Sequence, residues 1–214
     1  MRCFIIGNGP SQNNFDLTLL KDETTFGSNG IHLIFDKFMP SYWFVTDNYY
    51  FNCHKDKIIN SNYTGILYST ANIYFPETIT PFTTRKVDII DCGINTPTIT
   101  HGFETELHSA GDHSIGCVTY LMLQKAWQLD FREFYMIGMD SKIPRPPLED
   151  HMVEGYGGDM DDPNERGLQE LHPDVWKDGF RFAREFIEEN DGVIYDVSDG
   201  ECGFFEHKKF EDIL

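Results

Sequence analysis

The chain has 214 residues, enough for one domain with a sizeable core, and its hydrophobic content of 40% excludes a disordered protein. The formal net charge of −18 repels the phosphate backbone of nucleic acids, so we expect no DNA or RNA partner. No apolar run reaches the roughly 18 residues of a membrane span, so we expect no span.

Five cysteines are scattered along the chain without a CxxC pair. This pattern argues against a disulfide framework and against a zinc knuckle. The first residues carry no signal-peptide cleavage site and run directly into an apolar stretch. These features predict a cytoplasmic protein, and they leave a homo-oligomer open.

Short apolar runs alternate with helical patterns along the chain. Strands are expected over residues 2–6, 24–29, 41–48, 64–70, 85–93, 132–140 and 192–199. Helices are expected over residues 31–38, 114–130 and 174–189. The alternation predicts an α/β fold, a Rossmann-like, doubly wound and mostly parallel sheet with helices on both faces. We expect a single domain over residues 1–214, in which the irregular segment 141–173 forms a lid or a flexible loop.

The first expected strand ends in the turn Gly7-Asn8-Gly9-Pro10-Ser11. Neither glycine has a Cβ, so the backbone can approach a ligand closely, and the proline stiffens the turn. No Lys-Ser/Thr pair follows, which excludes a Walker A loop, and the full GxGxxG spacing of a dinucleotide site is missing. Two interpretations stay open, a ligand-binding loop and a tight structural turn between a strand and a helix.

Other expected strands also end in polar residues. Asn29 follows the second strand, Asp47 the third, and Gly138 and Asp140 close the strand over 132–140. Open α/β sheets bind ligands beyond the carboxyl ends of their strands. We therefore expect these residues to share one site with the first turn.

The longest predicted helix starts at Ser114. Its first turn, which includes Gly116, offers small residues and free backbone amides that could bind an anion or a ribose. Simple helix capping explains the same residues equally well. In the acidic loop, Asp159 and Asp161 resemble the Asp-x-Asp element with which many glycosyltransferases hold a metal and a diphosphate. A solvated acidic surface is the alternative interpretation. His172 precedes Pro173 and a helix start, and it is the histidine best placed for proton transfer.

The motifs IIGNGPS, TFGSN, HSIG and EFYMIGMD occur in an order that resembles two related families. One is the bacterial sialyltransferase family that modifies lipooligosaccharide. The other is the MptE-like family, named for 6-hydroxymethylpterin diphosphokinase. The resemblance covers about residues 3–50 and 109–199.

Resemblance to the sialyltransferases implies a Rossmann-like domain that binds a CMP-linked sugar donor. The sugar would pass with inversion to a hydroxyl of a glycan-type acceptor, in a reaction that requires no metal or other cofactor. Asn8, Gly9 and Ser11 would line the phosphate and the sugar, and Asn29 would hydrogen-bond the donor.

The resemblance also assigns roles in the second half of the chain. Ser114 and Gly116 would meet the sugar carboxylate or the nucleotide, while Gly138 and Asp140 would hold the ribose or the base. His172 would be the general base that takes the proton of the acceptor hydroxyl.

The chain departs from the sialyltransferases after Asp140, where they place tyrosines that stabilise the departing phosphate. Ser-Lys-Ile-Pro-Arg stands here instead. Candidates for the missing role are the cations of Lys142 and Arg145, and Tyr156 from the expected lid.

Two alternatives to a glycosyltransferase stay open. An MptE-like diphosphokinase would use ATP and Mg²⁺, with Asp47 and Asp140 among the metal ligands. A non-catalytic nucleotide-binding module on the same fold is the other alternative, since a fold does not fix a function.

Overall fold

The computed structural model describes residues 1–70, 87–90, 118–140, 173–198 and 202–214. These residues form one eight-stranded sheet in which every pairing of neighbouring strands is parallel. The strands are β1 (Arg2–Ile6), β2 (Thr25–Ser28), β3 (Tyr42–Val45), β4 (Ile66–Thr70), β5 (Val87–Ile90), β6 (Glu133–Ile137), β7 (Val193–Asp196) and β8 (Glu206–His207).

Three α-helices and four 3-10 helices are described together with these strands. The α-helices are α1 (Asn48–Ile59), α2 (Val118–Gln128) and α3 (Pro173–Glu189). The 3-10 helices are η1 (Pro10–Asn14), η2 (Leu17–Leu20), η3 (Asn29–Ile34) and η6 (Phe210–Asp212). Among the described residues, no helix is both long enough and apolar enough to cross a membrane.

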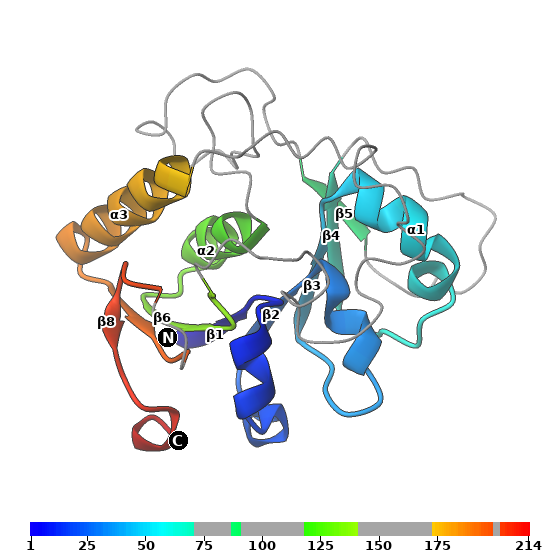
Figure 1. The fold of residues 1–214 in the computed structure, drawn as a ribbon, viewed down its shortest axis with the longest axis horizontal. Coiled ribbons are helices and arrows are strands. Elements are labelled where there is room, and N and C mark those ends of the chain that lie inside the picture. Colours follow the sequence, from blue (N-terminus) through cyan, green and yellow to red (C-terminus); the bar gives the residue numbers. More distant parts are fainter. Residues whose placement is uncertain (71–86, 91–117, 141–172, 199–201) are drawn as a thin grey trace.

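The strand order is β5-β4-β3-β2-β1-β6-β7-β8, which places β5 and β8 at opposite ends of the sheet (Figure 1). From β1 the chain builds the sheet in one direction as far as β5, and it then returns to the other side of β1 with β6. The sheet therefore has a topological switch point between β1 and β6, and the predicted doubly wound α/β fold is confirmed.

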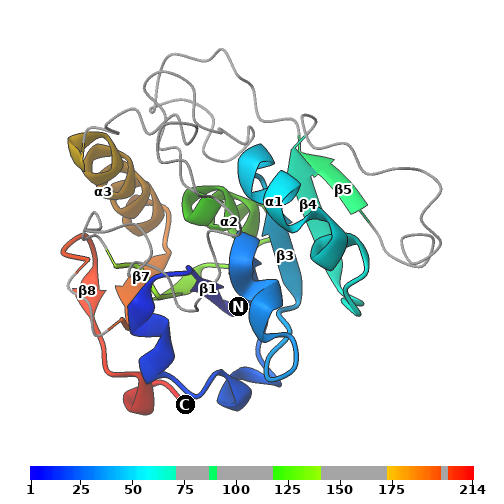
Figure 2. The ribbon, with the colours of Figure 1, turned by 45° about the vertical axis from the view of Figure 1, so that its right-hand side comes forward.

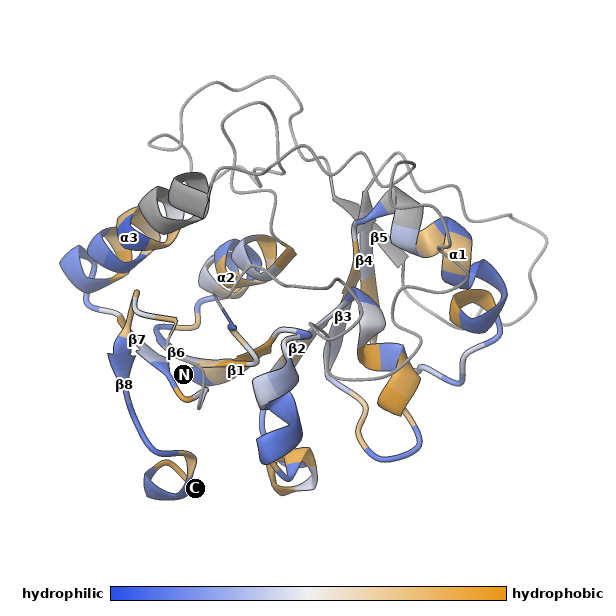
Figure 3. Ribbon diagram, viewed as in Figure 1, coloured by the Kyte–Doolittle hydropathy of each residue, from blue (hydrophilic) through white to orange (hydrophobic). Residues whose placement is uncertain are grey.

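The two faces of β1 bury alternate residues in two separate cores. Cys3 and Ile5 belong to the core that α2 and α3 cover, whereas Phe4 and Ile6 belong to the core beneath α1 and the 3-10 helices. Figure 2 shows α1 on one side of the sheet and α2 and α3 on the other. Burial on both faces explains why the central strand β1 is hydrophobic (Figure 3).

The helix α1 was not predicted from the sequence. Its polar residues obscure the buried positions Tyr50, Phe51, His54 and Ile58, which lie on one helical face. The predicted strand over 41–48 ends earlier, at Val45, because α1 begins directly behind it. The predicted helix over 31–38 was also partly wrong, because the structure has the 3-10 helix η3, which starts at Asn29.

Most other predicted elements agree with the structure to within a few residues. The start of the helix predicted over 114–130 and almost all of the lid predicted over 141–173 lie outside the described residues. The strand β8 was not predicted, since two residues carry no recognisable pattern.

Candidate functional site

The loops that follow β1 and β6 meet at the switch point of the sheet. Gly7 N donates to the carbonyl of Ile137 (2.8 Å), and Gly9 N donates to the carbonyl of Gly138 (3.1 Å). A Cβ on either Gly7 or Gly9 would lie 2.6 Å from the carbonyl oxygen of Gly138. Both glycines are therefore required for the close packing of two loops of the protein itself, which favours the structural interpretation of the turn.

Gly138 is constrained from two directions. Its φ of +67° lies in the left-handed region that favours glycine, and a Cβ there would lie 2.9 Å from the carbonyl oxygen of Gly7. The next residue, Met139, donates its amide hydrogen to Ser198 Oγ (3.1 Å), which connects this loop to the end of β7. The loop after β6 is thus held by its two neighbouring strands.

The loops after β1 and β6 are also joined through side chains. Ser11 N and Ser11 Oγ both donate to Asp140 Oδ2, at 3.0 and 2.8 Å. Pro10, which begins η1, is exposed beside this pair. The structure thus brings together residues of two motifs that the sequence analysis expected to lie close to each other, Gly7, Gly9 and Ser11 of the first turn with Gly138 and Asp140.

Asn8 connects this group to the end of β2. Its Nδ2 donates to Ser28 Oγ (2.7 Å), and Ser28 Oγ donates to the carbonyl of Ile6 (3.2 Å). Asn8 and Ser28 are both buried. Ser28 was not selected from the sequence, where it is only a small residue before Asn29.

Asn29 is held by three donors at the end of β2. Its Oδ1 accepts from Thr46 N (3.1 Å), and its carbonyl oxygen accepts from Trp43 Nε1 (3.0 Å) and from His32 Nδ1 (3.2 Å). Within the described part of the chain, Asn29 Nδ2 makes no hydrogen bond. A fixed amide with two unused hydrogens is suited to recognise an acceptor oxygen on a ligand.

Asp47 follows β3 and caps the helix behind it. Its Oδ1 accepts from Tyr50 N (3.0 Å), which caps the start of α1. Asp47 is exposed. No group of three or more His, Cys, Asp or Glu side chains is placed to hold a metal ion among the described residues.

Two buried polar side chains near the site were missed by the sequence analysis. Gln12 is 3% exposed, and neither its Oε1 nor its Nε2 has a hydrogen-bond partner among the described residues. It lies against the Gly138 turn, since a Cβ on that glycine would be 3.3 Å from Gln12 Cβ. His32 is buried in η3, and its burial lowers its pKa to about 4. The one signal in the sequence that could have pointed to Gln12 and His32 is that they follow the first turn and Asn29 closely in the chain.

Several predicted site residues lie outside the described residues. They are Ser114, Gly116, Lys142, Arg145, Tyr156, Asp159, Asp161 and His172. Their assigned roles stay predictions.

The fold and the meeting of these loops define the chain as a Rossmann-like α/β protein with a candidate ligand site at the carboxyl edge of its sheet. Comparisons of the chain with protein-family models, with curated proteins and with solved structures each gave no match. The functional argument is therefore based on the geometry of the site and on the motifs of the sequence.

Proposed function

We propose that the chain is a glycosyltransferase that binds a nucleotide-sugar of the CMP type at the carboxyl edge between β1, β2 and β6. This proposal is carried by the unused donor of Asn29. Its Nδ2 has no hydrogen-bond partner among the described residues, although the two oxygens of Asn29 accept hydrogen bonds from three donors. A rigid and unused donor beside the switch point is what a polar ligand of an open α/β sheet requires.

The resemblance to the sialyltransferases supplies the chemistry of the proposal. The acceptor hydroxyl attacks the anomeric carbon, a new carbon–oxygen bond forms with inversion, and the bond to the nucleotide phosphate breaks. The phosphate leaves with the bonding electron pair, and His172 takes the proton of the acceptor hydroxyl. An imidazole suits this role, because its ordinary pKa lies close to neutral pH.

Isothermal titration calorimetry with CMP, CDP, UMP, UDP and ATP, each with and without Mg²⁺, tests the binding part. We expect a cytidine nucleotide to bind without Mg²⁺, and we expect Asn29→Ala to weaken its binding about tenfold, the value of one good hydrogen bond. Asn60→Ala is the matched control, because Asn60 is an exposed asparagine at the end of α1 whose Nδ2 donates to a local carbonyl.

A second assay tests the transfer. Wild-type protein should release CMP from a CMP-sugar, slowly with water and faster with a glycan acceptor, and His172→Ala should abolish the acceleration. Binding of ATP alone with strict Mg²⁺ dependence would instead favour the diphosphokinase. If no nucleotide binds at millimolar concentration, the proposal is wrong.

A further inference from the structure

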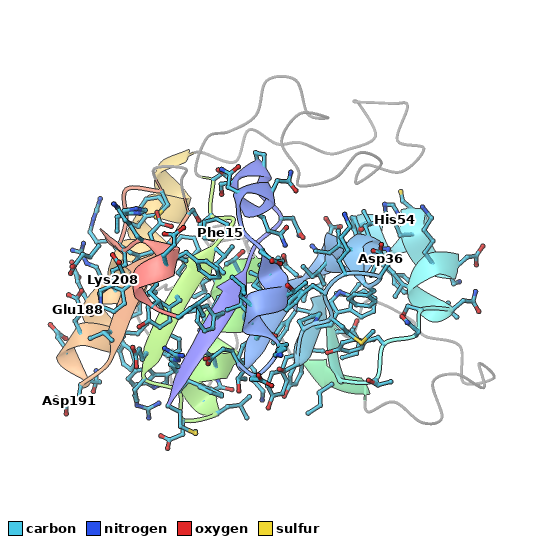
Figure 4. All side chains as sticks on the ribbon, turned by 90° about the horizontal axis from the view of Figure 1, so that it is seen from below. Phe15, Asp36, His54, Glu188, Asp191 and Lys208 are labelled. Atoms are coloured by element: carbon cyan, nitrogen blue, oxygen red, sulfur yellow. The ribbon has the colours of Figure 1, made fainter. Side chains whose placement is uncertain are left out.

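His32 is a buried imidazole in η3, enclosed by aromatic rings from β3 and α1. Its ring centroid lies 5.5 Å from that of Trp43, 5.9 Å from that of Tyr50 and 5.5 Å from that of His54. Figure 4 shows His54 on α1 as a labelled side chain. With 9% of its surface exposed, His32 is part of the packed layer behind the candidate site and does not line an open surface.

The hydrogen bonds of His32 define its tautomer. Its Nδ1 lies 3.2 Å from the carbonyl oxygen of Asn29, and a carbonyl oxygen can only accept, so Nδ1 carries the hydrogen. The hydroxyl of Tyr50, at 3.5 Å from Nδ1, can only share this hydrogen. Nε2 is buried and has no hydrogen-bond partner among the described residues, so a proton placed there would be unsatisfied.

The bond from His32 Nδ1 to the backbone carbonyl of Asn29 is one of three that hold Asn29 in place. His32 Nδ1 and Trp43 Nε1 approach the Asn29 carbonyl from two side chains, while Thr46 N holds Asn29 Oδ1. The bonds from His32 and Trp43 fix the backbone of Asn29, from which its side chain projects, and the bond from Thr46 N fixes the orientation of the side-chain amide. We propose that His32, as its neutral Nδ1–H tautomer, is a positioning residue that holds Asn29 so that Asn29 Nδ2 faces the nucleotide donor, an inference that rests on the function proposed above.

The electrostatic surroundings keep His32 neutral. The pKa of His32 is lowered to about 4, chiefly by burial. The hydrogen bond to the Asn29 carbonyl opposes this shift, while the neighbouring His54 and Lys57 on α1 act in the same direction as burial. The other polar groups that face the ring are the Tyr50 hydroxyl of α1 and the Trp43 indole of β3, and Asp36 behind η3 is exposed. His32 is therefore uncharged at neutral pH and donates only through Nδ1.

Two substitutions separate positioning from packing. In His32→Asn, the amide Nδ2 stands where the imidazole Nδ1 stood, so the donor to Asn29 is kept while the ring is lost. His32→Leu fills a similar volume with an apolar side chain and removes the donor. His207→Asn, at an exposed histidine of β8, is the matched control.

Nucleotide binding is measured by calorimetry at pH 7.5 for all variants, together with their unfolding in urea. We expect His32→Leu to bind CMP about tenfold more weakly than wild type, the loss of one hydrogen bond. We expect His32→Asn to bind within threefold of wild type even where its resistance to urea is lower. Equal binding by all variants, or equally weakened binding by both His32 variants, would overturn the inference.

A nuclear magnetic resonance measurement without ligand keeps the test independent of the proposed function. In wild type, the ¹⁵N spectrum should show Nδ1 of His32 as the protonated nitrogen, and the side-chain amide of Asn29 should give one sharp pair of signals. That pair should broaden or shift in His32→Leu and return in His32→Asn. If it is unchanged in His32→Leu, the inference fails, whereas absence of nucleotide binding by wild type refutes the proposed function alone.

Discussion

Ser11 and Asp140, which lie 129 positions apart in the chain, form a two-point contact across the switch point of the sheet. The backbone amide and the hydroxyl of Ser11 both donate to the same carboxylate oxygen of Asp140, at 3.0 and 2.8 Å. This contact joins the loop after β1 to the loop after β6, directly at the switch point where open α/β sheets bind their ligands.

Removal of the Asp140 carboxylate should loosen this connection. We expect Asp140→Ala to lower the free energy of unfolding by about 1–2 kcal/mol, because two donors of Ser11 lose their acceptor in a partly buried place. Asp140→Asn keeps one acceptor oxygen and should lose less. Urea unfolding followed by tryptophan fluorescence measures both, and Ser11→Ala, which removes only the hydroxyl donor, should fall between wild type and Asp140→Ala. An Asp140→Ala variant as stable as wild type would contradict this view of the contact.

The packing of Gly7 against Gly138 leads to a second prediction. We expect Gly7→Ala to destabilise the protein by about 3 kcal/mol, because the new Cβ would lie 2.6 Å from a backbone carbonyl oxygen that cannot move away alone. Gly203 offers a control, since its φ is +70° but nothing lies within 4 Å of an added Cβ. Gly203→Ala should therefore cost only backbone strain, about 1 kcal/mol. Equal losses in the two variants would show that steric packing at Gly7 is unimportant.

The sequence predicted the parts of this fold in which one local pattern decides the outcome. The unbroken apolar run Cys3–Ile6 indicated a strand, which the structure buries on both faces, and the glycines at 7 and 9 indicated its end. The parallel sheet followed from the alternation of strands and helices, because parallel strands need crossover connections.

Long-range partners could not be predicted in this way. Ser11 and Asp140 were both selected, but no local pattern indicates that they bond to each other. The glycines were selected for the approach of a ligand, whereas the close approach in the structure is between backbone atoms of the loops after β1 and β6. The burial of His32 depends on rings from β3 and α1, and α1 itself was missed, so this residue could not stand out.

Gln12 provides a third prediction, because its buried amide makes no hydrogen bond among the described residues. Replacement by leucine, which has a similar volume, removes two unsatisfied polar atoms and should raise the free energy of unfolding by about 1–3 kcal/mol. Asn14→Leu, at an exposed position of the same 3-10 helix, is the control and should change stability by less than about 0.5 kcal/mol. A Gln12→Leu variant that is less stable than wild type would show that the amide has a bound partner, such as an ordered water.

The buried His32 should make stability depend on pH. Its pKa is about 4 in the folded protein and 6.5 in the unfolded chain, so between these values the unfolded state binds more protons. Stability is therefore lost as the pH falls from 6.5 towards 4. Between pH 7.5 and pH 5.5, a range above the isoelectric point of about 4.6, the loss from this group should be about 1.3 kcal/mol.

Urea unfolding at the two pH values, compared between variants, isolates this contribution. His32→Asn cannot titrate, so the difference in its free energy of unfolding between pH 7.5 and pH 5.5 should be smaller than that of wild type by about 1.3 kcal/mol. His207→Asn removes an exposed histidine and should keep the wild-type difference. If His32→Asn shows the same pH dependence as wild type, His32 takes up its proton equally in the folded and unfolded states, and the assignment of a neutral, buried imidazole is wrong.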